Sequence, residues 1–217
     1  MDPYIKTAIL KGILETLRMT AFASVFAYIV GLPLGILLYT TSKGRIYENK
    51  VINTVVGAIV NVSRSLPFLI LPVLLIPVTR FIVGASIGTT ASIVPLTIGA
   101  IPIVARMVES SLNEVPSGII EAANSMGASP LFIVFHFILP EAGPSLVLGA
   151  AINIATVLGY SAMAGVIGGG GLGALALQYG YYRYQKDVLW ITVGILVVMV
   201  WAVQESGGLL SKKIRKS

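Results

Sequence analysis

The feature that most constrains this chain is a series of apolar stretches, each near the length of a membrane-crossing helix. A helix needs about 20 predominantly apolar residues to cross about 30 Å of hydrocarbon. The first stretch contains MTAFASVFAYIVGLPLGILLYT (19–40), in which no residue carries a charge. A membrane β-barrel would need segments of about 10 residues that alternate in polarity, and the sequence has none. The pattern therefore predicts an all-α, polytopic membrane protein.

Composition leads to the same class. Of the 217 residues, 56% are hydrophobic and 11% are charged, and the mean hydropathy is +0.90. Soluble domains carry about 25% charged residues, so a water-soluble globule is excluded. The absence of cysteine excludes disulfides and thiol chemistry. A net charge of +6 is typical of the Lys and Arg in cytoplasmic loops of membrane proteins, so we expect contact with membrane lipid and no nucleic-acid partner.

We expect a single transmembrane domain, 1–217, with about five spans. The second span carries three prolines at five-residue intervals, which should bend it. These are Pro67, Pro72 and Pro77. The expected spans are 14–40, 55–79, 91–110, 144–167 and 188–206.

The basic residues predict the orientation of these spans. Lys and Arg gather in the first loop, 40–50, and in the tail, 212–216, which places both segments in the cytoplasm. Five spans then put the N-terminus outside and the C-terminus in the cytoplasm. The first span should remain in the mature protein, because basic residues rather than an apolar core precede the AFA string at 21–23.

One segment, EAANSMGASPLFIVFHFILP (121–140), fits no span: its first half is too polar and its apolar run, 131–139, is too short. Its turn residues predict two short helices. Pro116 suits a first helical turn, and Gly127 suits the left-handed position after a helix. Ser129 and Pro130 suit the start of the next helix. That helix should end by Leu139, before Pro140. We therefore expect a cytoplasmic helical hairpin over about 116–139.

The hairpin has two interpretations from its pattern alone. It either connects two spans as an interfacial helix, or it docks a partner. In the second case the small side chains of Ala122 and Ala123 would form the docking face. Glu121 would then fix its orientation.

The same string resembles the loop motif in membrane subunits of bacterial ABC importers. That motif reads Glu-Ala-Ala, three residues, Gly, nine residues, Ile, one residue and Leu-Pro, and Phe137 here stands in the Ile position. The resemblance implies that the hairpin is a coupling element, docked on a cytoplasmic ATPase subunit and transmitting its closure. The residues in register are Glu121, Ala122, Ala123, Gly127, Leu139 and Pro140.

Three further strings, 62–88, 94–112 and 157–184, are similar to the methionine-type ABC importer permease, so the resemblance covers about 8–206. It implies a type I ABC importer permease fold in the bacterial cytoplasmic (inner) membrane. It also implies a homodimer, two ATPase subunits and an extracytoplasmic binding protein that delivers methionine. D- and L-methionine are not distinguished by the residues. The chain itself would be no enzyme and hold no cofactor, since ATP and Mg belong to the ATPase subunit.

Four residues are candidates for the translocation pathway or its gate: Arg64, Tyr160, Ser161 and Met163. A charge at mid-bilayer costs at least about 2.5–3.5 kcal/mol, so Arg64 either snorkels to the interface or lines the pathway. Ser161 and Gly165 have the spacing of close helix packing. Alternatively, Tyr160 and Met163 face the dimer axis, where Met163 closes the pore. Arg106 and Glu109, three residues apart, are expected to form a structural ion pair.

The Gly cluster 168–173 invites comparison with a phosphate-binding loop. It lacks the Gly-Lys-Ser/Thr ending that such a loop needs, so we expect no ATP hydrolysis by this chain. We interpret it as a flexible outer loop against which a binding protein settles.

Other functional classes fit less well. A serine protease needs a base near its nucleophile, but the one histidine, His136, lies in the hairpin. One His and no Cys also disfavour a metal site. An ion-coupled secondary transporter of small amino acids is the alternative function. It generally needs acidic groups or broken helices near the midplane, whereas the acids here lie at the ends of the spans.

Overall fold

The computed structural model describes residues 3–215, and the regular structure within them is helical. The elements in order are α1 (Pro3–Thr41), α2 (Lys50–Arg64), α3 (Leu71–Leu74), α4 (Ile76–Val83), α5 (Thr89–Asn113), α6 (Ser117–Ser125), α7 (Pro130–Ile133), η1 (Val134–Ile138), α8 (Leu139–Glu141), α9 (Gly143–Val166), α10 (Gly171–Leu175), η2 (Ala176–Tyr181) and α11 (Lys186–Arg215). The elements η1 and η2 are π-helical. The predicted all-α class is confirmed.

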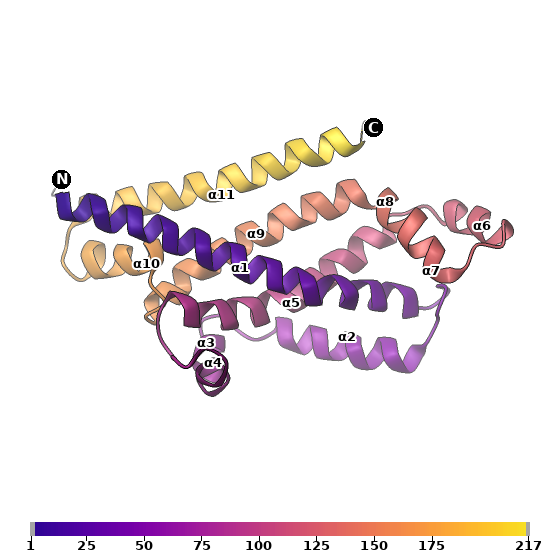
Figure 1. The fold of residues 1–217 in the computed structure, drawn as a ribbon, viewed down its shortest axis with the longest axis horizontal. Helices are drawn as coiled ribbons and strands as arrows, with labels where there is room; N and C mark the ends of the chain where they lie inside the picture. The colour runs from indigo at the N-terminus through magenta and orange to yellow at the C-terminus, as the bar shows by residue number, and fades with distance from the viewer. Residues whose placement is uncertain (1–2, 216–217) are drawn as a thin grey trace.

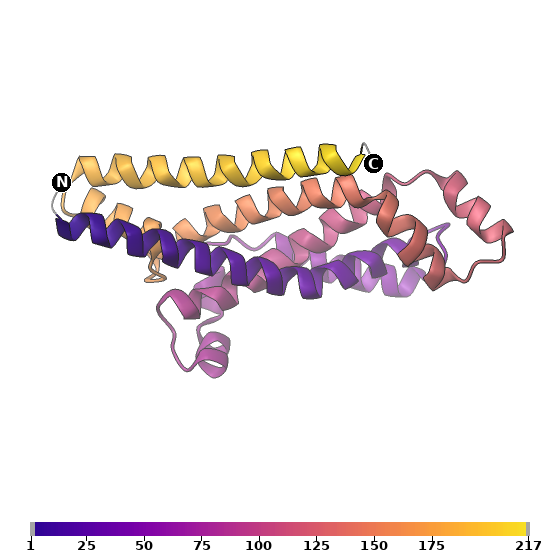
Figure 2. The same ribbon diagram turned by 45° about the horizontal axis from the view of Figure 1, so that its top comes forward.

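Four long helices, α1, α5, α9 and α11, run along the length of the molecule (Figure 1). They give four segments of the described chain that are long and apolar enough to cross a membrane, the third of which continues from α9 through η2. Figure 2 shows the N-terminus at one end of this bundle and the α6–α7 hairpin beyond the other. The hairpin and the C-terminal end of α11 lie toward the same end.

The expected second span, 55–79, is not one helix. Helix α2 ends at Arg64, irregular backbone follows, and α3 and α4 are separate. Pro67 has no N–H and disfavours helix at the residue before it. Pro72 and Pro77 instead lie at the starts of α3 and α4, where a missing N–H is harmless. The prolines thus break this segment rather than bend it.

Helix α4 lies across the long helices. It is seen nearly end-on in Figure 1 and projects from the bundle in Figure 2. Phe81, on its outer side, is 92% exposed. An exposed aromatic residue on a helix that crosses the bundle is typical of an element at the membrane surface.

The core of the molecule is the contact of α1 with α5. A Cβ added to Gly31 would lie 2.7 Å from Val104 Cβ, and one added to Gly35 would lie 2.5 Å from Val108 Cβ. Both valines are buried. Small residues let membrane helices approach closely, and α1 continues as helix through Pro33 between the two glycines. The Gly–Pro–Gly pattern therefore builds the contact surface of α1.

We predict that Gly35→Val lowers the stability of the protein in detergent by about 1–3 kcal/mol, because the new side chain overpacks the α1–α5 contact. Thermal unfolding of the purified chain measures this. Gly194→Val is the matched control, because a Cβ at Gly194 meets nothing within 4 Å. Equal loss in both variants would contradict the role assigned to the contact.

Candidate functional site

The hairpin predicted at 116–139 is present as two short helices. Pro116 directly precedes α6, and Pro130 opens α7. Gly127 has φ +73°, the left-handed conformation, and the N–H of the next residue, Ala128, donates to Ala123 O at 3.2 Å. The left-handed residue therefore reverses the chain where the sequence predicted it.

The second helix does not end at Leu139 as expected. The helical turn widens into η1, in which Leu139 N–H donates to Val134 O, and α8 continues through Pro140 to Glu141. A proline in an α-helix clashes with the carbonyl four residues earlier. A π-turn contains an extra residue and so removes that clash, which lets the chain pass into α9 with only a short interruption.

The residues of the coupling motif divide between two faces. Glu121 and Ala122 are exposed, whereas Ala123 is fully buried against the rest of the protein. Leu139 is half-buried and Pro140 is exposed. Ala122 and Ala123 therefore do not form one docking face as expected, because Ala123 faces inward.

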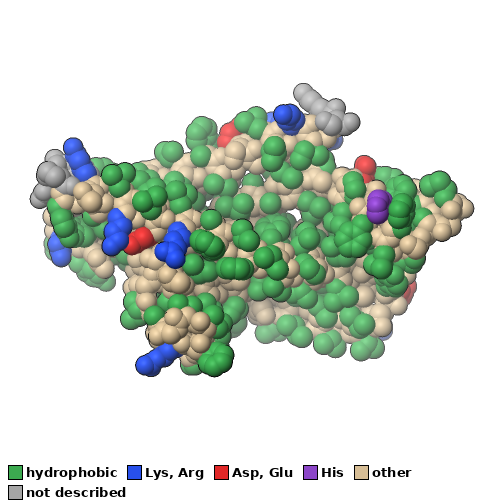
Figure 3. Space-filling view, viewed as in Figure 1, with side chains coloured by type: hydrophobic (Ala, Val, Ile, Leu, Met, Phe, Trp, Pro, Cys, Tyr) green, Lys and Arg blue, Asp and Glu red, His purple; other side chains and the backbone are tan. Residues whose placement is uncertain are grey.

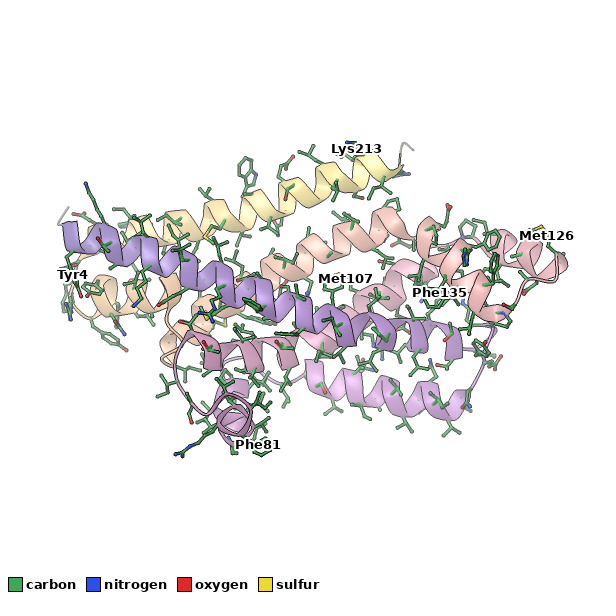
Figure 4. All side chains as sticks on the ribbon, viewed as in Figure 1. Tyr4, Phe81, Met107, Met126, Phe135 and Lys213 are labelled. Carbon is green, nitrogen blue, oxygen red and sulfur yellow. The ribbon has the colours of Figure 1, made fainter. Side chains whose placement is uncertain are left out.

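The hairpin also presents large side chains that sequence reasoning missed. His136 stacks on Phe132 with ring centroids 4.0 Å apart, and both are exposed. Figure 4 shows Phe135 and Met126 projecting from this end of the molecule. The four-residue spacing of Phe132 and His136 is the available sequence signal. Together these side chains form an exposed apolar surface beyond the helical bundle.

Arg64 lies exposed at the end of α2 and forms no ion pair or hydrogen bond with any other residue in 3–215. It lines a cavity of about 560 Å³ together with residues of α5, among them Arg106 and Glu109. Arg106 Nη1 lies 2.6 Å from Glu109 Oε2, and Arg106 Nη2 donates to Gly57 O at 3.0 Å. The predicted ion pair is confirmed, and it also holds α2 against α5.

The gate candidates on α9 have different surroundings. Ser161 is buried and its hydroxyl donates to Leu158 O at 2.7 Å. Tyr160 stacks on Phe68, in the irregular segment after α2, with ring centroids 4.3 Å apart. Met163 is 46% exposed. Met163 alone of the three thus presents its side chain at an open face of the subunit.

The Gly cluster 168–173 is not a flexible loop. Gly171 N–H donates to Glu15 Oε2 at 2.8 Å, and Leu172 N–H donates to Thr16 Oγ1 at 2.9 Å. Gly171 adopts positive φ, and a side chain there would clash with Thr16. The glycines let the chain turn tightly against α1 and α9, so the expected loose loop is a packed turn. Its position on the outer side stays a prediction.

A family model described as binding-protein-dependent transport system inner membrane component matches residues 31–216. The chain belongs to this family. It is therefore a multi-pass inner-membrane permease subunit, which is a non-enzymatic component of its transporter.

Relatives within this family extend over most of the chain. A probable D-methionine transport system permease protein MetI of Vibrio cholerae is 50% identical over 200 residues, covering 92% of this chain and 89% of that protein. The D-methionine permease MetI of Escherichia coli K12 is 53% identical over 157 residues, or 72% of each chain.

Solved structures agree with the observed fold. An inward-facing MetNI methionine ABC transporter has a subunit with a TM-score of 0.97 and 47% identity, covering 99% of each chain. An amino acid ABC transporter with histidines matches with a TM-score of 0.79 and 24% identity over 96% of this chain and 94% of that one. The second likeness concerns the fold alone. Both place the chain in the type I permease fold.

Gly127→Val should loosen the hairpin, because a β-branched residue at φ +73° is strained. We expect faster hydrogen–deuterium exchange over 117–138 and unchanged exchange in α1 and α5. Gly118→Val is the control, since that position has no positive φ and no neighbour within 4 Å. Identical exchange in the two variants would contradict the role of Gly127.

Proposed function

We propose that this chain is the membrane-spanning subunit of an ATP-driven importer of methionine. It works as a homodimer with two ATPase subunits and receives methionine from an extracytoplasmic binding protein. The observation that carries the proposal is the 0.97 TM-score to the methionine transporter over 99% of both chains. The MetI relatives at 50% and 53% identity support the same substrate.

The arrangement of the chain supports a cytoplasmic hairpin and C-terminus, with the N-terminus outside. The hairpin and the end of α11 lie toward one end of the bundle in Figure 1, and the N-terminus lies at the other. The basic loop after α1 belongs to the hairpin end, where Arg45 Nη2 donates to Asn113 Oδ1 at the end of α5. Basic residues on this side agree with the positive-inside rule.

The hairpin is placed to transmit force. Its first helix follows α5 after three residues, and its second runs through η1 and α8 into α9. Ala123, Ile133 and Ile138 pack into the same buried cluster as the α1–α5 core. ATP and Mg are held by the ATPase subunits, so closure of those subunits moves the hairpin, and the hairpin moves α5 and α9.

Within the membrane, the movement of α9 transmits closure of the ATPase subunits to the translocation pathway. Met163 lies 24 residues beyond Leu139, about 36 Å along a helix, and serves as the resting gate. Tyr160 links α9 to the broken second segment by its contact with Phe68. Arg64 is exposed beside the 560 Å³ cavity and supplies the positive charge that lines the translocation pathway. Ser161, which is buried, supports close packing of α9 rather than contact with substrate.

Reconstitution of the chain with its ATPase subunit and binding protein tests the function. We expect uptake of labelled methionine that requires ATP. Glu121→Ala, at an exposed motif position, should raise the ATP hydrolysed per methionine several-fold, because the docked hairpin loses a charged contact worth about 1.5–3 kcal/mol. Glu205→Gln on the exposed face of α11 is the control. Uptake driven by an ion gradient without ATP would favour the secondary-transporter alternative and overturn the proposal.

A second variant tests the gate. Met163→Ala should increase leak of methionine through the resting transporter, because a smaller side chain no longer fills the pore. Met163→Leu, which keeps the size and apolar character of the residue, should remain tight. Leak is measured as efflux from loaded vesicles without ATP. Unchanged efflux in Met163→Ala would argue against this residue as the gate.

A further inference from the structure

An apolar groove of about 450 Å³ opens on the outside of the bundle, where α1, α4 and α5 meet. Its walls include Phe22 and Phe26 of α1, Ile82 of α4, and Val94 and Ile98 of α5. The hydroxyl of Thr97, also in the wall, donates to Ile93 O of its own helix at 2.8 Å. The groove therefore suits an apolar ligand, and its size falls within the usual range of about 300–1,000 Å³ for ligand pockets.

One charged side chain, Arg18, lines this groove among the described residues. It is exposed and forms no ion pair or hydrogen bond within 3–215. Glu15 is three residues away, but its carboxylate accepts from Gly171 N–H and lies 3.9 Å from Lys11 Nζ. The guanidinium is therefore open to an anion from outside the subunit.

The position of Arg18 along α1 fixes its depth in the membrane. It is the last charged residue before the uncharged run 19–42, so it lies where headgroups meet hydrocarbon. Phe22 and Phe26 follow on the same face at about 6 Å and 12 Å further in. Helix α4, which crosses the bundle, forms the other wall. Figure 3 shows hydrophobic side chains covering the adjoining surface of these helices.

We propose that this groove binds an anionic phospholipid of the bilayer. Its phosphate pairs with Arg18, because a guanidinium offers two parallel donors to phosphate oxygens. One acyl chain lies along Phe22, Phe26, Val94 and Ile98. A second copy of this chain, or a helix of another protein, would bring apolar side chains over Arg18 and leave that charge buried without a partner, which is unfavourable. The assignment of this lipid to the outer leaflet rests on the orientation given under Proposed function, and the site itself does not.

Binding of phosphatidylglycerol to the full-length chain, purified in detergent with the ATPase subunit it retains, tests this site. Native mass spectrometry measures the bound fraction. Arg18→Gln should weaken binding roughly tenfold through loss of the charge-assisted contact. Arg80→Gln is the matched control, since Arg80 is exposed on α4 and does not line the groove. Zwitterionic phosphatidylcholine should bind the unchanged protein more weakly than phosphatidylglycerol. Equal effects of the two variants would mean general attraction to charge and overturn the proposal.

The absence of cysteine provides a second measurement that does not depend on a disruptive variant. Val94→Cys places one small thiol in the groove, and Val198→Cys places one on the exposed face of α11. Phosphatidylglycerol should slow maleimide labelling at position 94 and leave position 198 unchanged. No protection at position 94 would show that the lipid lies elsewhere. Protection without lipid that vanishes on dissociation of the dimer would identify the groove as a subunit interface; either result overturns the proposal.

Discussion

The structure depends on one constraint: in hydrocarbon, each backbone polar group must find its partner within the protein. The four long helices satisfy it by themselves. The irregular segments satisfy it by lying against those helices. At the start of α10, the backbone N–H groups of its first two residues donate to Glu15 and Thr16 of α1. At Gly57, the carbonyl of α2 accepts from Arg106 of α5 in addition to its place in the helix.

The sequence predicted the helical class and the hairpin because both rest on local signals. Apolar length defines a span, and a glycine at positive φ with a following Ser-Pro defines a turn. Local signals could not predict whether each proline would break its helix or be accommodated within it. Pro33 lies within a continuous helix, Pro67 lies in the irregular segment between α2 and α3, and Pro140 is accommodated by a π-turn. Their different outcomes depend on packing by neighbouring helices.

The candidate site was predictable in part for the same reason. The motif located the hairpin, but which of Ala122 and Ala123 faces a partner depends on how α6 rests on the bundle. The role of the Gly cluster was missed because its partners, Glu15 and Thr16, lie more than 150 residues earlier: the contact is between residues 156 apart. In the sequence, Arg18 is only one of the basic residues that precede the AFA string at 21–23. Its significance comes from α4 and α5, which no local pattern brings beside it.

The direction in which the hairpin faces depends on the number of residues in its π-turn more than on which side chains they carry. The π-turn holds one residue more than an ordinary turn, and one residue corresponds to about 100° around a helix axis. Deleting a single residue from Val134–Ile138 would rotate α6 and α7 about the axis of α9. Glu121 would then point in a different direction. Substitutions within Val134–Ile138 that keep the number of residues also keep this rotation. The number of residues in this segment is therefore fixed by geometry more tightly than its composition is.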